Sequence, residues 1–487
     1  MAEVTRREFG KLAAAAGCAA AVPGWAGSAN PMIGIQVGAV SFVDEGVEPV
    51  LDRFQHEAAV NTLFIAAFSY GRGIAGRQVP GQPLPDHGKQ EYDTGFRGGN
   101  FARVHPQYYR GTSLKNIQAT DYGNFDVLGE VIPAARARGM KTICWYEDVF
   151  RRDLDGIDQL QEVTLSGKKA STLCFHNPEV QAFWRGLTED FVRSYPIDGI
   201  MWGSERQGPF GNAIRSVHGG GGLDPMSVTC FCNSCRQEAT RRGIDVQRAI
   251  EGYTKLAELV RTPSRPSDGY FVSYWRLLVQ YPEILGWEKL WNDGLQSTYA
   301  SLHKLAKSVR PEIGVGWHIW HNNSFSPFYR AEQDYAEFRR YSDFLKVVMY
   351  NNCGGPRLAS YVRNVSHTIF ADFAPEAVLE WTYGVQNYKE ASLDEIPQRG
   401  LSADYVARET KRALAGVGGA VRIWPGIDID IPTGANEKKT QPEDVRESVQ
   451  AALGAGADGV ILSRKYSEMR LANLRAAGEA VRSSAHP

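Results

Sequence analysis

The chain has 487 residues, 43% of them hydrophobic, so it can bury a large core and has room for one barrel with insertions or for roughly two to three ordinary domains. Its 54 lysine and arginine residues balance its 55 aspartate and glutamate residues. A nearly neutral chain has neither the basic surface of a nucleic-acid-binding protein nor the charge of a membrane-surface protein, which excludes both classes.

The first 29 residues resemble a twin-arginine export signal. Residues 5–12 read TRREFGKL, an Ala-rich run follows to Val22, and small residues at 26–29 suggest a cleavage site. The alternative is a basic start to an Ala-rich helix. Cys18 lacks the preceding leucine of a lipoprotein site, so no lipid anchor is predicted. We therefore expect the twin-arginine machinery to export the protein to the periplasm or the medium.

The remainder, residues 30–487, alternates apolar runs with amphipathic ones. Eight runs are predicted strands: 33–42, 61–70, 141–146, 198–202, 313–320, 344–350, 421–424 and 458–462. Six segments between them are predicted helices: 47–57, 124–138, 178–195, 289–310, 402–416 and 442–456. Eight β-α units in series predict an α/β fold, a (β/α)8 TIM barrel with long βα-loop insertions. No run in this part approaches the ~18 apolar residues of a membrane span, so we expect a soluble mature chain.

Three connections are too long to be turns. The segment 71–123 is rich in Gly, Pro and aromatics and is expected to form a wall over the barrel mouth. The segment 207–286 carries a cysteine cluster and the glycine run 219–222, which lacks the Lys-Ser/Thr of a phosphate loop and is better read as a hinge. The third, 354–416, is expected to be mostly helical, with Glu380 on a helix that starts at Pro375-Glu376.

The stretch 197–206, IDGIMWGSER, is the centre of the functional hypothesis. It reads as a buried parallel strand that breaks at Gly203-Ser204 and delivers Glu205. In a parallel barrel, polar groups at the C-terminal ends of the strands meet at the active site. A buried salt bridge or a loop anchor is the alternative interpretation of an isolated glutamate.

Three cysteines, Cys230, Cys232 and Cys235, lie within six residues, a spacing suited to one soft metal ion. Cys174 is the best candidate for a fourth ligand, with His176 and His218 as runners-up. Four thiolates would make a closed, structural zinc site rather than a catalytic one. A disulfide with one spare thiol is the alternative in an exported protein.

Together, Cys174 before Asn177-Pro178, the strand ending at Glu205 and the cysteine cluster resemble the bacterial β-galactosidases of glycoside hydrolase family forty-two, over roughly residues 140–300. The resemblance implies a zinc held by Cys174, Cys230, Cys232 and Cys235, and Glu205 as the acid/base. Two departures set the chain apart from the true β-galactosidases and favour a more distant glycoside-hydrolase-like barrel family. The family has Asn before the acid/base where this chain has Ser204, and its nucleophile is a Glu at the seventh strand, where this chain has Asp428 and Asp430.

Glycoside cleavage needs one carboxylic acid and a second carboxylate. Glu205 is the predicted acid, Asp428 the first choice of partner and Glu147 the second. Other predicted strand ends supply candidate substrate-binding residues: Tyr146, Trp202, Arg206, Trp317, His318, Tyr350, Asn351, Arg464 and Lys465. The arginines and lysine could hold carboxylates ionised or bind an acidic sugar. His318 and His321 could form a metal pair, although hydroxyl binding or packing is favoured.

The predicted function is therefore an exported glycoside hydrolase that acts on a carbohydrate. A non-catalytic glycan-binding barrel is an alternative, because fold does not fix function. An exported oxidoreductase is a second alternative, but residues 34–38, GIQVG, lack the Gly-x-Gly-x-x-Gly turn of a dinucleotide site.

Overall fold

The computed structural model describes residues 31–219 and 224–484. The predicted export signal therefore lies outside the described residues. Within them, no helix combines the length and apolar character that crossing a membrane requires.

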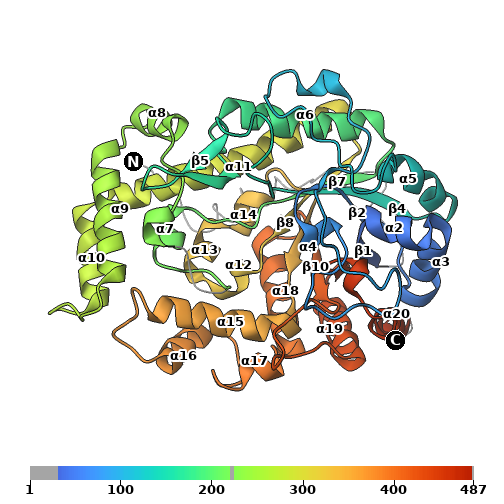
Figure 1. Ribbon diagram of the computed structural model, residues 1–487. Helices are drawn as coiled ribbons and strands as arrows, with labels where there is room; N and C mark the ends of the chain where they lie inside the picture. Colours follow the sequence, from blue (N-terminus) through green and yellow to red (C-terminus); the bar gives the residue numbers. More distant parts are fainter. Residues whose placement is uncertain (1–30, 220–223, 485–487) are drawn as a thin grey trace, which may run out of the picture.

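Eight parallel strands close into a barrel (Figure 1). They follow one another around the barrel as β1, β2, β4, β7, β8, β9, β10 and β11, and β11 pairs with β1. Their bounds are β1 Met32–Gly38, β2 Thr62–Ser69, β4 Lys141–Glu147, β7 Gly199–Gly203, β8 Gly314–Ile319, β9 Phe344–Val348, β10 Arg422–Asp428 and β11 Gly459–Ser463. All eight strand predictions and the (β/α)8 fold are confirmed. The first predicted strand ran to residue 42, whereas β1 ends at Gly38.

Helices surround the barrel and fill the long connections (Figure 1). The longer ones are α3 Val47–Ala58, α5 Val127–Ala137, α6 Pro178–Ser194, α8 Asn233–Arg241, α9 Val246–Arg261, α10 Tyr270–Gln280, α11 Glu283–Val309, α15 Asn351–Ser366, α16 Pro375–Gln386, α18 Ala403–Val417, α19 Pro442–Gly454 and α20 Leu471–Ser484. Short ones are α2 Ala39–Glu45, α4 Arg72–Ala75, α7 Pro209–Ala213, α12 Asn322–Phe325, α13 Pro327–Glu332, α14 Tyr335–Phe338 and α17 Ile396–Arg399, with 3-10 turns η1 Pro106–Tyr109, η2 Pro225–Ser227 and η3 Tyr466–Glu468. Three minor strands are β3 Gly99–Asn100, β5 Gln161–Val163 and β6 Lys169–Leu173.

Local sequence explains where these helices begin. At α6, the Asn177 side chain accepts a hydrogen bond from the Glu179 amide and Pro178 occupies the first turn. At α16, Pro375 takes the same position, so Glu380 lies on an exposed helix face as expected. The segment 354–416 is accordingly mostly helical.

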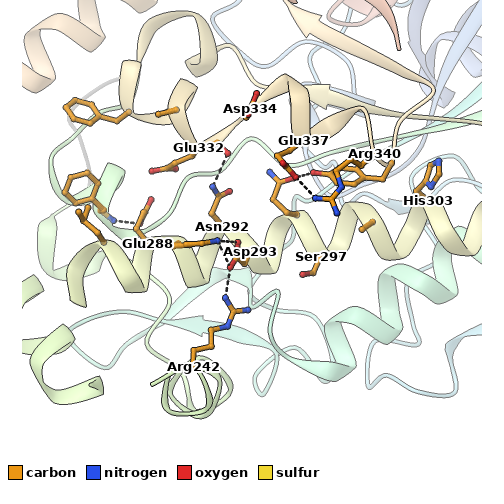
Figure 2. A pocket seen from close by; sticks show the side chains of 18 of the residues that line it. Arg242, Glu288, Asn292, Asp293, Ser297, His303, Glu332, Asp334, Glu337 and Arg340 are labelled. Atoms are coloured by element: carbon orange, nitrogen blue, oxygen red, sulfur yellow. Dashed lines mark hydrogen bonds and ion pairs between the residues drawn. The ribbon is translucent and has the colours of Figure 1, made fainter. Parts of the chain in front are cut away.

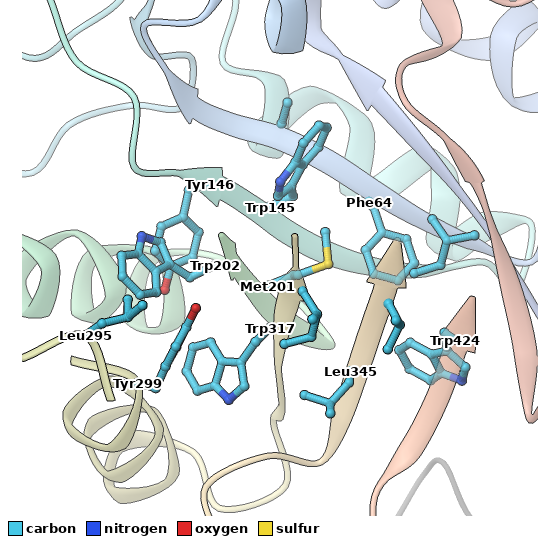
Figure 3. Packing of buried hydrophobic residues seen from close by; sticks show 14 of the residues in the cluster. Phe64, Trp145, Tyr146, Met201, Trp202, Leu295, Tyr299, Trp317, Leu345 and Trp424 are labelled. Atoms are coloured by element: carbon cyan, nitrogen blue, oxygen red, sulfur yellow. The ribbon is translucent and has the colours of Figure 1, made fainter. Parts of the chain in front are cut away.

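The core has two parts, inside and outside the barrel wall, because side chains alternate along each strand (Figure 3). Inside, Trp424 stacks on Phe344 with ring centroids 4.3 Å apart. Outside, Trp202 and Trp317 pack against Tyr299 of α11 with centroid distances of 5.1 and 4.7 Å. This alternation decides which polar residues reach the barrel interior.

Candidate active site

Glu205 lies two residues beyond the end of β7, at the C-terminal mouth of the barrel. Both of its neighbours are tied to Asp148, which follows β4: the Ser204 hydroxyl donates to Oδ2 at 2.9 Å and Arg206 donates to the same oxygen at 2.7 Å. Arg206 also pairs with Glu162 at 2.6 Å. The flanking residues are thereby anchored in the wall, while the Glu205 side chain remains 48% exposed.

His318, the fifth residue of β8, holds the Glu205 carboxylate. Its Nε2 lies 3.0 Å from Glu205 Oε1, and its side chain is 5% exposed. Its Nδ1 accepts from Lys346 Nζ at 3.3 Å, so the tautomer that satisfies both contacts carries its proton on Nε2 and donates it to Glu205. The imidazole thus joins the exposed carboxylate to buried groups below it.

Glu147, the last residue of β4, is a second carboxyl group beneath Glu205. It accepts a 2.6 Å hydrogen bond from Trp145 Nε1, and its Oε1 lies 3.6 Å from His318 Nδ1. Gly203 provides the space, because a Cβ there would lie 2.4 Å from Glu147 Oε2. A side chain on this residue of β7 would therefore displace the Glu147 carboxyl group.

Lys346 of β9 completes the buried group. Its ammonium donates to Gln36 Oε1 at 2.6 Å, to the Tyr350 hydroxyl at 2.7 Å and to His318. Sequence analysis did not select Lys346 or Gln36. The sequence does contain a signal for them, because each is a polar residue inside an otherwise apolar strand. Burying such a residue is costly unless it has polar partners, so its presence indicates a polar site.

Strand register explains why these residues meet. Glu147 pairs with Gly203, Gly203 with His318 and His318 with Lys346, so the four form one row across β4, β7, β8 and β9. Residues directly opposite in neighbouring strands project to the same face. The row therefore places an acid, an imidazole and an amine together inside the barrel, with a glycine gap between the first two.

The carboxyl groups differ in protonation. Burial raises the pKa of Glu205, but the hydrogen bond and charge of His318 and the charge of Arg357 outweigh burial and lower it to about 2. Burial, and then the charge of Glu205, raises the pKa of Glu147 to about 8. At neutral pH Glu205 is ionised and Glu147 is protonated, which is the division of states that acid/base pairs use.

The two nitrogen groups are also shifted. Burial and the neighbouring Lys346 lower the pKa of His318 to about 4, so the imidazole is neutral at pH 7. Burial lowers the pKa of Lys346 to about 7. A proton can therefore be exchanged at this amine near neutral pH, directly beside the imidazole that contacts Glu205.

Three predicted site residues face away from the barrel interior. The Tyr146 hydroxyl contacts Thr188 Oγ1 of α6 at 2.7 Å, Trp202 packs on α6 and α11, and Trp317 Nε1 donates to a backbone carbonyl. The cause is alternation, because each lies next to an inward residue of its strand. They stabilise the barrel wall and do not line the mouth.

Three others are engaged in local structure. Asp428 is fully buried and accepts from the backbone amides of Cys353 and Ile431 at 2.9 and 3.1 Å, so it holds the turn after β10. Burial raises its pKa to about 6. The Asn351 amide contacts a carbonyl of the α17–α18 connection, and Lys465 donates to three carbonyls of the first insertion.

Arg464 and Tyr350 belong to the mouth itself. Arg464 forms a two-pronged contact with Glu468, at 3.2 and 2.8 Å, and its guanidinium faces Gly73 of the first insertion. Tyr350 links Lys346 to Arg357, whose guanidinium lies 5.9 Å from its ring centroid. Of the predicted residues, the structure thus brings together Glu205, Glu147, His318 and Tyr350, with Arg464 at the rim.

The predicted cysteine cluster assembles. The Sγ atom of Cys174 lies 3.5 Å from that of Cys235 and 3.4 Å from that of Cys232, and the four ligand atoms, including Cys230, all lie within 4.8 Å of one another. Among the described residues, no other group of His, Cys, Asp and Glu is close enough to hold a metal ion. His176 instead contacts the Leu290 carbonyl at 2.9 Å. The four cysteines could therefore bind a metal without a histidine.

A cavity of about 1070 Å³ lies elsewhere, between α11 and the α13–α14 segment (Figure 2). Its floor holds Glu288, which accepts from the Phe210 amide at 2.7 Å and whose pKa burial raises to about 7. None of its lining residues belongs to a barrel strand. Its size alone does not make it the candidate site, because the contacting carboxyl, imidazole and amine groups with shifted pKa values lie at the strand ends.

Comparison with known proteins supports the fold. No family model and no curated protein sequence matches the chain. The chain is similar to a β-galactosidase from the Antarctic haloarchaeon Halorubrum lacusprofundi, with 14% identity and a TM-score of 0.51, over 92% of this chain and 57% of that one. The chain is also similar to a β-galactosidase from the psychrophilic Marinomonas ef1, with 9% identity and a TM-score of 0.51, over 93% of this chain and 59% of that one.

A catalytic mutant of a GH42 β-galactosidase from G. stearothermophilus is 11% identical with a TM-score of 0.48, over 94% of this chain and 57% of that one. The chain thus spans less than two thirds of the length of these structures. At such identities, the likeness to the two structures with a TM-score of 0.51 shows a shared fold and no more.

Proposed function

We propose that this protein is a glycoside hydrolase in which Glu205 is the carboxyl group that acts on the substrate. The observation that carries the proposal is a half-exposed, ionised Glu205 at the barrel mouth, joined through His318 to a protonated Glu147. Glycoside hydrolysis uses two carboxyl groups whose surroundings drive their protonation states apart.

The buried residues give Glu205 a route to a proton. Glu205 is ionised at rest, whereas the general acid expected from the sequence must be protonated when the glycosidic oxygen leaves. Lys346 donates to Nδ1 of His318, whose Nε2 proton faces Glu205. When Lys346 transfers a proton to Nδ1 of the imidazole, the Nε2 proton can therefore pass to the Glu205 carboxylate. No side chain has to move.

Glu147 replaces Asp428 as the second carboxyl group of this proposal. Its side chain is only 5% exposed, so it acts through His318 rather than by direct contact with a sugar. Asp428 is saturated by backbone amides and is assigned to the turn instead.

The test is hydrolysis of a panel of aryl glycosides and polysaccharides by the wild type and by Glu205→Gln. We expect kcat/KM of the variant to be lower by a factor of roughly 10² or more, because an amide can neither ionise nor donate a proton as a general acid. Glu380→Gln is the matched control, since this glutamate is exposed on α16. Equal activity of wild type and Glu205→Gln would contradict the assignment. A wild type that binds glycans without cleaving any would favour a glycan-binding barrel.

We also propose that the four cysteines hold a structural zinc ion. Tetrahedral zinc-thiolate geometry places sulfurs about 3.8 Å apart, close to the separations seen here and far from the ~2.05 Å of a disulfide. Zinc would join Cys174, which precedes α6, to the insertion that contains α8.

Export by the twin-arginine machinery to the periplasm or medium remains part of the proposal, on the evidence of residues 5–29. Replacing Arg6 and Arg7 with lysines should leave the protein in the cytoplasmic fraction.

A further inference from the structure

Arg357 stands at the barrel mouth without an acidic partner. It lies in α15, which begins directly beyond β9, and its side chain is partly buried. Its NH1 is 3.0 Å from His321 Nδ1, and its guanidinium lies over the Tyr350 ring at 5.9 Å. Burial of a guanidinium is costly unless the charge is paired.

Two other partly buried arginines of the barrel end have such partners. Arg206 pairs with Asp148 and Glu162, and Arg464 pairs with Glu468. Within residues 31–219 and 224–484, no carboxylate lies within ion-pair distance of Arg357. Its direct contacts are the His321 imidazole and the Tyr350 ring, and the carboxyl groups of Glu205 and Asp428 interact with its charge only at longer range. The planar fork of its donors is thus left available on one side.

The charge of Arg357 acts on several ionisable groups around the mouth. Glu205 is the exposed carboxylate of the site, whereas the charge of Arg464 is met by Glu468. The charge of Arg357 acts across the whole mouth, since it helps to lower the pKa values of both Glu205 and His218.

We propose that Arg357 binds an anionic group, a carboxylate or a sulfate, on the sugar that is positioned against Glu205. The inference rests on the proposed function and narrows its substrate class to acidic glycans. A guanidinium fork matches the geometry of both groups bidentately, which an amine does not.

The test measures binding, which does not depend on turnover. The full-length protein is titrated by calorimetry with D-glucuronate, D-galacturonate, galactose 6-sulfate and the neutral sugars glucose and galactose. We expect at least one acidic sugar to bind at least tenfold more tightly than its neutral counterpart. A preference for the uronates or for the sulfate ester identifies which anion is recognised.

Variants on α15 provide the matched comparison. Arg357→Gln should lose at least tenfold in affinity for the acidic sugar and nothing for the neutral one, and Arg357→Lys should recover only part of the loss. Arg363→Gln, an exposed residue in the last turn of the same helix, should bind as the wild type does. Unchanged melting temperatures would exclude a purely structural effect.

The two proposals fail in different ways. If acidic sugars bind through Arg357 but no glycoside is cleaved, the hydrolase proposal is lost and the anion site stands. If neutral glycosides are cleaved and Arg357→Gln leaves their kcat/KM unchanged while acidic ones are no better, the anion site is lost. Failure of every acidic sugar to bind also overturns it.

Discussion

Glu205, His318 and Glu147 form a chain in which one imidazole separates two carboxyl groups of opposite protonation state. Burial acts on both carboxyl groups in the same direction, so burial alone cannot separate them. What separates them is that Glu205 accepts a hydrogen bond from Nε2–H of His318, whereas Glu147 faces Nδ1 of the same ring and the negative charge of Glu205. The states follow from the orientation of one ring.

The raised pKa of Glu147 predicts a pH-dependent stability. Its ordinary pKa is 4.5 and its folded pKa is about 8, so the folded state holds a proton that the unfolded state gives up within this window. Its contribution to stability is complete below pH 4.5 and is lost as the pH rises through 8. Relative to Glu147→Gln, the wild type should therefore lose unfolding free energy between pH 5 and 8, by up to about 1.4 kcal/mol per unit.

Denaturant titrations of both proteins at pH 5, 6.5 and 8 measure this difference, with Glu380→Gln as the exposed control. Parallel curves for wild type and Glu147→Gln would mean that Glu147 is ionised in the folded state, and would remove it from the proton route.

At the scale of elements, four neighbouring strands bring the site together through one row of register. The row needs residues of unequal size: the glutamate, histidine and lysine can occupy it only because β7 contributes Gly203 between them. A glycine inside a strand weakens that strand, which is consistent with a position kept for close approach.

Gly203→Ala should therefore disturb the site and the fold together. The added Cβ would lie 2.4 Å from Glu147 Oε2, and overpacking of this kind costs about 1–3 kcal/mol. We expect a lower melting temperature and reduced activity. Combining Gly203→Ala with Glu147→Ala should recover part of the lost stability, because the second substitution removes the carboxyl group that the added Cβ would contact.

Gly384→Ala serves as the control, since a Cβ there meets nothing within 4 Å and alanine suits a helical position in the last turn of α16. If Gly203→Ala is as stable and active as Gly384→Ala, the packing account of the row is wrong.

At the scale of the molecule, the cysteine cluster joins the barrel to its largest insertion. Cys174 precedes α6 of the barrel, while Cys230, Cys232 and Cys235 lie in or beside the start of α8. The insertion is further held by Trp287 of α11, whose Nε1 donates to the Cys230 carbonyl at 3.0 Å. A metal at this point would tie sequence-distant parts of the chain.

Metal analysis after mild purification should find about one zinc per chain, and a strong chelator should lower the melting temperature. Cys174→Ser should lose the metal, because three thiolates remain. Cys144→Ser, at a buried cysteine outside the cluster, should retain it. Metal well below one equivalent, or a mass two hydrogens lighter than the free thiols, would favour the disulfide alternative.

The sequence by itself determined the eight strands, the barrel and the assembly of the four cysteines, because hydrophobic runs, helix starts such as Asn177-Pro178 and clustered thiols are local patterns. It also selected Glu205, Glu147 and His318. It did not separate these from Tyr146, Trp202 and Trp317, since a one-residue difference in position along a strand decides between interior and exterior, and an uninterrupted apolar run does not reveal it.

Only the tertiary structure assigned Lys346, Gln36 and Arg357 to the mouth and Asp428 to a turn. These assignments depend on which strands are neighbours, on their register and on the groups left without a partner after folding. Protonation followed from the same contacts, because the pKa of a carboxyl group depends on burial and nearby charges contributed by distant parts of the chain.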